Sequence, residues 1–456
     1  MNFTKTSDFL CAFGLSASLY AQARPWLDAD SKRRLVFIED RPDALAQLKR
    51  EDDAIVLLND QRVKLYLLET PLQLEPFAKK IAWSAVFLKM EILDVSHSPH
   101  FAPFRELMES THLAADLLLS DGADWGCSAI RHAKKNLARP HRLSADLSFP
   151  NIPAVIVGAG PSLEKNGKLL ERFQNRALIL AGGNALDRLP FSPHFGAAVD
   201  KEEPLLRISF PMAPFCFQAR MHPKNFALAK GEAILVPEGH FSFINWLAGE
   251  EPLFDGGWTV GNFLTALAVQ WGCNPIVLVG MDYCYSGKKK YAKGPDAAIS
   301  SLVETVNSEG RSVLTQRDWL MAVRWTEELA EKHRDRLFLN ASEGGVRCLS
   351  PVKLQDLAWK EIPDLQATVS GAIGRAPVRS SPDRWAEWEG SLRRCADLCN
   401  KYLEADFEGE IAYHLLLQPL WAIWKPVFER EIVRDMGLNE ILFYQQVIQE
   451  HLDALL

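Results

Sequence analysis

Short apolar runs alternate with longer helix-like stretches through the middle of the chain, from about residue 150 to 350. Apolar runs of four to six residues, bounded by glycine, proline or asparagine, are typical of strands that are covered on both faces. The runs lie at residues 153–157, 177–181, 195–199, 233–236, 275–279 and 336–339. Their alternation with helical patterns predicts a parallel α/β domain over residues 150–350.

The first part of the chain, residues 1–149, shows a weaker version of the same pattern. Residues 34–39 and 54–58 are β-like, residues 86–88 are a further candidate strand, and helical patterns lie between them. We therefore expect a small N-terminal α/β domain.

The N-terminal apolar stretch, residues 1–27, resembles a signal peptide only in outline. Asp8 precedes the apolar run, and Gly14 and Ser16 interrupt it. No basic segment adjoins the run, so we predict an amphipathic helix rather than a cleaved signal.

The last part, residues 351–456, is predicted to be helical after a linker at residues 377–382. Pro419 and Pro426 are expected to break or kink this region. Its tryptophans are interpreted as helix-packing residues, with an acceptor-binding surface as the alternative.

Charge and cysteine content narrow the possible functions. A net charge of −7 argues against a general nucleic-acid binder. No apolar run reaches the roughly 18 residues that a membrane span requires. The eight cysteines contain no CxxC pair, so we expect a reduced, cytoplasmic protein without a metal site.

The first central strand is followed by a glycine-rich turn, Gly158-Ala-Gly-Pro-Ser-Leu163. Gly158 and Gly160 allow a tight turn and a close approach to a ligand, and Pro161 suits the first turn of a helix. Ser162 can cap that helix or contact a phosphate. Leu163 replaces the third glycine of a dinucleotide-binding motif, and no P-loop motif is present.

Polar residues follow the next two strands at the same predicted edge of the sheet. Gly183 and Asn184 come after the second strand, where Asn184 can contact a base or ribose or simply cap a helix. Asp200 follows the third strand, where a carboxylate can bind a ribose, a metal or a proton. Parallel sheets bind ligands at this edge.

A second glycine-rich turn, residues 256–262, precedes an apolar helix. Thr259 and Asn262 lie in this turn and could contact another part of a phosphate.

The fifth strand is followed by a further set of candidate groups. Gly280 and Asp282 end this strand, and Tyr285 and Tyr291 bring hydroxyls on a lysine-rich loop. We predict catalytic roles for Asp200, Asp282, Tyr285 and Tyr291. We predict that the nucleotide or nucleotide-activated donor is bound by Gly158, Gly160, Pro161, Ser162, Gly183, Asn184, Thr259, Asn262 and Gly280.

These motifs, taken in order, resemble the family that joins bacterial motility-accessory-factor (Maf) glycosyltransferases with archaeal 6-hydroxymethylpterin diphosphokinases (MptE-like). The matching pieces are GAGPSLE, AGGNAL, AAVDKEEP, GGWTVGN, LVGMDYCYSG and FLNASEGG. The resemblance implies a central Rossmann-like domain. The flanking segments favour the glycosyltransferase branch, because its members also carry an N-terminal domain and a C-terminal helical region.

The chain also resembles bacterial CMP-sialic acid-dependent sialyltransferases. That likeness implies that the first glycine loop and Asn184 bind CMP, and that Tyr291, with Tyr285, assists the departing phosphate. Those enzymes use a histidine base after the tyrosine loop, but residues 307–318 contain no histidine. Asp200, Asp282 and Glu309 remain the candidates for the base.

The sequence leaves three functions open. The first is transfer of a sugar, a nonulosonic acid in our reading, from a CMP-activated donor to a protein or glycan hydroxyl. The second is a diphosphokinase that uses ATP and a pterin alcohol, with Mg²⁺ bound by carboxylates such as Asp200 and Asp282. The third is a nucleotide-binding protein without catalytic activity.

Overall fold

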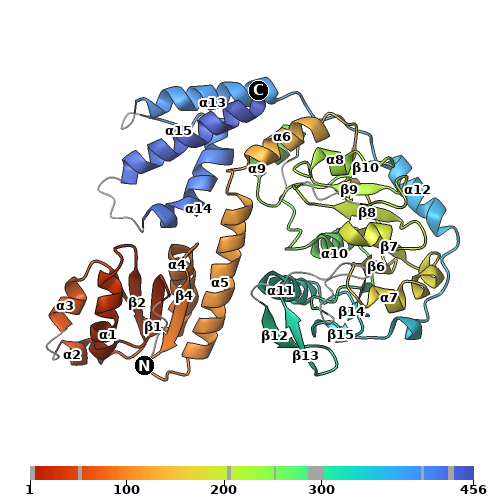
Figure 1. Ribbon diagram of the computed structural model, residues 1–456. Coiled ribbons are helices and arrows are strands. Elements are labelled where there is room, and N and C mark those ends of the chain that lie inside the picture. The colour runs from red at the N-terminus through yellow and green to blue at the C-terminus, as the bar shows by residue number, and fades with distance from the viewer. Residues whose placement is uncertain are drawn as a thin grey trace. The chain divides into compact units, whose positions relative to one another are not determined.

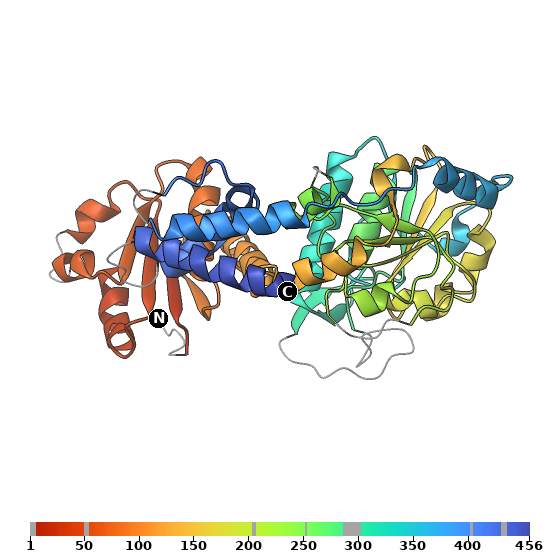
Figure 2. The same ribbon diagram turned by 90° about the horizontal axis from the view of Figure 1, so that it is seen from above.

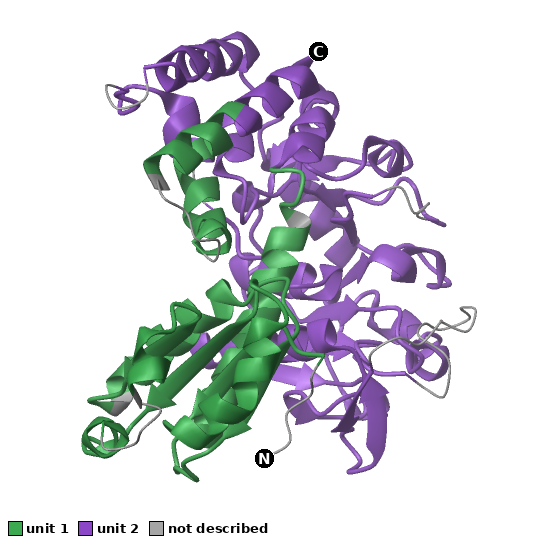
Figure 3. Ribbon diagram, turned by 60° about the vertical axis from the view of Figure 1, so that its left-hand side comes forward, with its two compact units in different colours: residues 1–125, 417–445 green, residues 126–416, 446–456 purple. Residues whose placement is uncertain are grey.

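The computed structural model describes residues 6–49, 54–202, 207–250, 253–285, 302–401, 405–429 and 436–456. The chain forms two compact units, shown in Figure 3: residues 1–125 with 417–445, and residues 126–416 with 446–456. The three segments expected from the sequence, residues 1–149, 150–350 and 351–456, stay a prediction.

The first unit is built on a four-stranded parallel sheet in the order β3-β2-β1-β4 (Figure 1). Its strands are β1 (Phe9–Phe13), β2 (Arg34–Glu39), β3 (Val63–Leu67) and β4 (Met90–Asp94). Its helices are α1 (Ala17–Asp28), α2 (Ala44–Leu48), α3 (Ala54–Asn59), η1 (Pro71–Gln73), α4 (Leu74–Ser84) and α5 (Phe101–Asp121). The predicted small α/β fold is confirmed.

Three local predictions in this unit are wrong. Phe9–Phe13 is a strand rather than part of a helix, because it pairs with β2 on one side and β4 on the other. Residues 54–58 lie in helix α3, with Leu57 buried and Ile55 72% exposed, so the run presents one apolar face. Residues 86–88 precede the strand that begins at Met90.

The second unit contains a nine-stranded parallel sheet in the order β15-β14-β11-β6-β7-β8-β9-β10-β5. All six predicted runs contain strands: β6 (Ala154–Val157), β7 (Leu178–Gly182), β8 (Phe195–Ala198), β10 (Ala233–Leu235), β11 (Ile276–Val279) and β14 (Phe338–Asn340). The further strands are β5 (Arg142–Leu143), β9 (Phe215–Phe217) and β15 (Ser350–Pro351). The predicted central parallel α/β fold is confirmed.

The helices of the second unit include several short ones. They are α6 (Cys127–Asn136), η2 (Ser144–Asp146), α7 (Leu163–Asn166), η3 (Leu169–Phe173), η4 (Gly183–Asp187), α8 (Pro223–Phe226), α9 (Ser242–Ala248), α10 (Val260–Gln270), α11 (Arg317–Lys332) and η5 (Leu354–Asp356). A separate antiparallel hairpin consists of β12 (Val303–Val306) and β13 (Ser312–Thr315).

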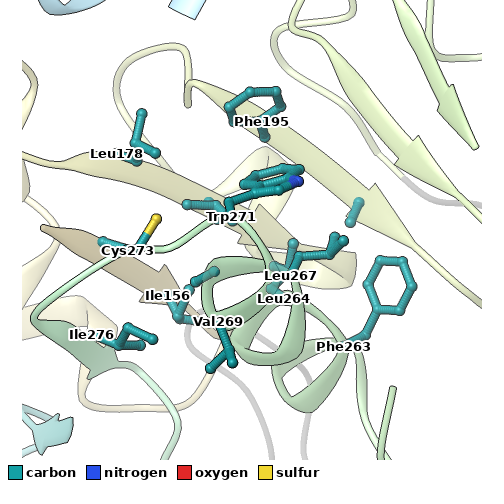
Figure 4. Close-up of a cluster of buried hydrophobic side chains, with 14 of the residues drawn as sticks. Ile156, Leu178, Phe195, Phe263, Leu264, Leu267, Val269, Trp271, Cys273 and Ile276 are labelled. Carbon is teal, nitrogen blue, oxygen red and sulfur yellow. The ribbon is translucent and has the colours of Figure 1, made fainter. Parts of the chain in front are cut away.

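Helix α10 is the principal buried helix of the second unit. Leu264 and Leu267 are fully buried in the cluster that contains Phe195 and Trp271, and Figure 4 shows these side chains together. The Phe195 and Trp271 rings lie 4.6 Å apart. This packing fixes α10 against the central strands.

The C-terminal region is helical, as predicted, with α12 (Leu365–Arg375), α13 (Trp385–Cys399), the π-helical turn η7 (Tyr413–Leu417), α14 (Gln418–Phe428) and α15 (Met436–Leu455). Helix α12 shares the core of the large sheet and lies beside it in Figures 1 and 2. Pro419 lies in the first turn of α14, whereas Pro426 lies inside that helix. Trp388 and Trp421 are buried packing residues.

Two further findings concern membrane-spanning helices and the cysteines. Among the described residues, no helix is long and apolar enough to cross a membrane. All eight cysteines fall within the described ranges, and each is a buried free thiol.

Candidate functional site

The order of the large sheet creates a point where the chain changes direction. From β6 the chain continues through β7 and β8 on one side, and it later returns to form β11 on the other side of β6. Loops that leave the carboxyl ends of two such strands diverge, and open α/β sheets bind their ligands there. The candidate site lies at this edge.

A cleft of about 480 Å³ opens at the switch point. Its volume is in the range of small-molecule sites, roughly 300–1,000 Å³. It brings together eight of the predicted residues: Gly158, Gly160, Gly183, Asn184, Asp200, Thr259, Gly280 and Asp282. These residues come from the ends of four strands and the start of α10, so the predicted edge is one continuous site.

The first glycine loop is bonded to the loop that follows β11. The Gly160 N–H donates to the Gly280 carbonyl at 2.7 Å. The Ser162 N–H donates to Asp282 Oδ2 at 2.6 Å, and the Ser162 hydroxyl donates to Asp282 Oδ1. Two of the amides expected to face a phosphate are therefore already paired within the protein.

The glycines of this loop are required by that contact. A Cβ on Gly160 would lie 2.7 Å from both Asp282 Cγ and the Gly280 carbonyl oxygen. A Cβ on Gly158 would lie 2.6 Å from the same carbonyl oxygen. Real side chains do not approach this closely, so the loops can meet only with glycine at both positions.

Asp282 is a buried carboxylate between the two loops, with 5% of its surface exposed. Burial raises the pKa of its carboxyl above the ordinary value, and the hydrogen bonds from Ser162 offset part of that effect. Because both carboxylate oxygens accept hydrogen bonds from Ser162, Asp282 positions the two loops that line the cleft.

Asp200 is placed differently, at the exposed end of the segment that follows β8. Although its side chain reaches solvent in the cleft, desolvation by the surrounding protein raises its pKa, and the positive charge of Arg220 lowers it in part. Arg220 itself forms an ion pair with Glu238 at 3.1 Å. Asp200 lines the cleft, where its carboxylate can accept a proton from a ligand.

The second glycine-rich turn ends in a capping box. The Thr259 side chain accepts from the Asn262 N–H at 3.2 Å, and the Asn262 side chain accepts from the Thr259 N–H at 3.2 Å. Asn262 Nδ2 also donates to the Ala322 carbonyl and to Thr326 in α11. Asn262 is fully buried behind the cleft, where it joins the two helices.

The start of α10 faces the cleft, which is lined by Trp258, Thr259, Val260 and Gly261. The first amides of a helix lack partners within the helix and carry the positive end of its dipole. This end of the cleft therefore suits an anionic group such as a phosphate.

The remaining predicted residues are not in the cleft. Pro161, Ser162 and Tyr285 line a second cavity of about 530 Å³, which is described below. Tyr291 lies outside the described residues. Glu309, a candidate base, pairs with Arg311 in the β12–β13 turn and does not line the cleft.

Sequence reasoning missed several lining residues. Asp318 and Trp319, from the first turn of α11, line the cleft although no local motif marks them. Trp258 lies inside the predicted glycine-rich turn, and Met281, Tyr283 and Cys284 flank Asp282. Adjacency in sequence would have identified these four, whereas Asp318 and Trp319 required the fold.

Within the described ranges, no group of three or more histidine, cysteine, aspartate or glutamate side chains is arranged to bind a metal ion. Asp282 is already engaged by Ser162. Of the two carboxylates predicted to bind Mg²⁺, Asp200 is therefore the one that Ser162 does not engage. Mg²⁺ is usually held by one or two carboxylates together with substrate phosphates and water.

The parallel sheet, the switch-point cleft and the helix start define a Rossmann-like domain with a site suited to a phosphorylated ligand. Residues 128–288 match the family described as 6-hydroxymethylpterin diphosphokinase MptE-like. The predicted resemblance to the Maf and MptE-like family is confirmed over this part of the chain.

A solved structure extends the similarity beyond that domain. The MAf glycosyltransferase from Magnetospirillum magneticum AMB-1 shares the fold with a TM-score of 0.58 and 17% sequence identity, over 98% of this chain and 78% of that one. No curated protein compared with the chain matches it in sequence. The likeness to sialyltransferases stays a prediction.

Proposed function

We propose that the protein is a glycosyltransferase that moves a sugar from a CMP-activated donor to a hydroxyl of a protein or glycan. The observation that carries the proposal is the fold similarity to the MAf glycosyltransferase over 98% of this chain, which includes the regions outside residues 128–288. Because a fold alone does not dictate a function, the groups that line the cleft must also suit the reaction.

The reaction would exchange one bond to the anomeric carbon for another. The bond from this carbon to the phosphate oxygen of CMP breaks, and CMP departs with the electron pair. The acceptor oxygen bonds to the same carbon, and its proton passes to a base. Such a reaction needs a bound phosphate, a stabilised leaving group and a base.

The cleft offers candidates for binding the phosphate and for the base. The start of α10, with Val260 and Gly261 lining the cleft, would bind the phosphate of CMP. Asn184, which is exposed in the cleft, would contact the base or ribose. Asp200 would accept the acceptor's proton, and Asp282 would position the loops. A role for Tyr291 on the departing phosphate remains part of the proposal.

A thermal-shift measurement tests the proposal. A ligand that binds only the folded protein raises its midpoint temperature. CMP or CDP without Mg²⁺ should raise this temperature, Asn184→Ala should abolish the shift, and the exposed control Asn400→Ala should retain it. No shift with any nucleotide would overturn the proposal in favour of a protein without nucleotide-dependent activity.

The second candidate is an ATP-dependent 6-hydroxymethylpterin diphosphokinase. The match of residues 128–288 to the MptE-like family favours it, whereas the hydrogen bonds from Ser162 that already engage both Asp282 oxygens do not. A shift with ATP that requires Mg²⁺, together with no shift from CMP, would select this function.

A further inference from the structure

A second cavity, of about 530 Å³, adjoins the cleft. Its walls come from the start of α7, the segment after β11, the β12–β13 hairpin and the turn after β14. Asp282 and Cys284 line both spaces. The two cavities therefore meet at the segment that follows β11.

The wall between the cavities is held in place by hydrogen bonds. Asp282 accepts from the N–H and the hydroxyl of Ser162, and its carbonyl accepts from the Val346 N–H at 2.8 Å. Gly345 packs so closely that a Cβ there would lie 2.7 Å from Asp282 Cα. Two molecules bound on opposite sides would meet at a defined place beside Asp282 and Cys284.

The hairpin wall is also fixed. Asn307 is 3% exposed, and its side-chain oxygen accepts from the backbone N–H of Arg311 at 2.8 Å and of Glu309 at 3.0 Å. The Tyr285 N–H donates to the Leu314 carbonyl at 2.9 Å, which ties the segment after β11 to β13. The hairpin side of the second cavity is therefore held in place by hydrogen bonds.

The lining of this cavity is polar and carries both signs of charge. Tyr285 is 5% exposed, its ring packs on Trp319 with centroids 5.3 Å apart, and its hydroxyl forms no hydrogen bond within the part of the chain that the structure describes. Glu343 and Lys165 bring an acceptor and a donor to the same space.

These groups suit a ligand with hydroxyls. Glu304 and Glu343 can accept hydrogen bonds and Lys165 and Arg311 can donate them, so an alcohol can donate to a carboxylate and accept from a cation in the same space. Because the charged side chains of the second cavity carry both signs, it suits a neutral polar ligand, whereas the start of α10 suits an anionic group in the cleft.

We propose that the second cavity is the acceptor subsite and that it takes an alcohol carried on a polar unit, with Tyr285 and Glu343 as its specificity residues. The inference rests on the proposed glycosyltransferase function. Transfer would occur in the cleft, where Asp200 lies, with the acceptor hydroxyl reaching past Asp282 and Cys284 from the second cavity.

Binding of two small alcohols to protein saturated with CMP tests this assignment. Methyl β-galactoside represents a sugar acceptor, N-acetylserine methylamide represents a protein acceptor, and saturation-transfer NMR measures each affinity. At least one probe should bind. Tyr285→Phe and Glu343→Gln should each weaken that binding at least about fivefold, while Glu171→Gln, an exposed glutamate outside both cavities, should not.

The shift in midpoint temperature caused by CMP separates the two proposals. It should be the same in Tyr285→Phe, Glu343→Gln and the wild type. Loss of the CMP shift in these variants would assign the cavity to the donor and overturn the inference, as would binding of neither probe or binding that ignores both substitutions. A wild type that binds a probe but shows no CMP shift would instead overturn the donor assignment.

Discussion

Two glycine-rich turns precede helices at the same edge of the large sheet, yet they do different work. In the turn after β6, Gly160 and Ser162 donate their amides to the neighbouring loop. In the turn before α10, a capping box pairs Thr259 with Asn262, and the helix start faces the cleft. Glycine at a strand-to-helix turn can thus serve a contact between loops as readily as a contact with a ligand.

The largest expected effect comes from breaking the contact between the loops. Gly160→Ala places a Cβ 2.7 Å from Asp282 Cγ and the Gly280 carbonyl oxygen, so we expect a loss of about 3 kcal/mol in the free energy of unfolding. Gly374→Ala is the matched control, because a Cβ there meets nothing within 4 Å. Urea unfolding of both variants measures the difference in stability, and equal stability would contradict the close contact between the loops that follow β6 and β11.

A somewhat smaller loss is expected when the second turn is disconnected from α11. Asn262→Ala removes the acceptor for the Trp258 and Thr259 amides and the donor to Thr326. Buried polar groups left without partners cost about 1–3 kcal/mol, and we expect a loss of about 2 kcal/mol. The exposed Asn400→Ala should change stability by less than about 0.5 kcal/mol under the same unfolding conditions.

The side-chain hydroxyls of Ser162 and Thr259, one in each turn, allow a comparison with smaller expected effects. Ser162→Ala and Thr259→Ala should each cost about 1 kcal/mol, since each removes a hydrogen bond at the start of a helix. Only Thr259 lines the cleft, so only Thr259→Ala should also reduce the thermal shift caused by CMP. A reduced CMP shift in Ser162→Ala alone would reverse the roles that we assign to the two turns.

The smallest expected effect is the change in the free energy of unfolding with pH that the titration of Asp282 causes. Burial raises its pKa in the folded protein above the ordinary value of an aspartate, so the folded state binds the proton more tightly than the unfolded state. Stability from this group is therefore greatest at low pH and declines as pH rises from that value through the folded pKa.

Asp282→Asn lacks this titration. The stability difference between the wild type and the variant should shrink as pH rises from about 4 to about 8, measured by urea unfolding at each pH. A difference that grows with pH would mean that the ionised carboxylate is the favoured form in the folded protein.

The sequence predicted the large sheet better than the small one. Six of the nine strands in the large sheet were identified, because they are continuous apolar runs bounded by glycine, proline or asparagine, whereas the short strands β5, β9 and β15 were missed. In the first unit, Phe9–Phe13 and residues 54–58 were assigned wrongly, because a short apolar run fits a strand or a buried helix equally well. Pairing of β1 with strands on both sides settled the first case.

The sequence likewise placed some of the candidate residues in the cleft correctly and missed or misplaced others. Residues at strand ends, such as Asn184 and Asp200, were found because parallel strands bring their carboxyl ends to one edge. Ser162 and Tyr285 were placed in the same site by sequence, but they line the neighbouring cavity. Asp318 comes from a helix that no local pattern links to the cleft.

The sequence by itself determined the parallel α/β fold, the edge of the sheet that carries the site and the family resemblance, because these depend on local patterns of apolar, glycine and polar residues. Only the tertiary structure decided which amides remain available to a ligand and that two cavities meet beside Asp282. Hydrogen bonds between segments far apart in the chain, such as those from Ser162 to Asp282, leave no local pattern, so they become visible only once the strands are assembled.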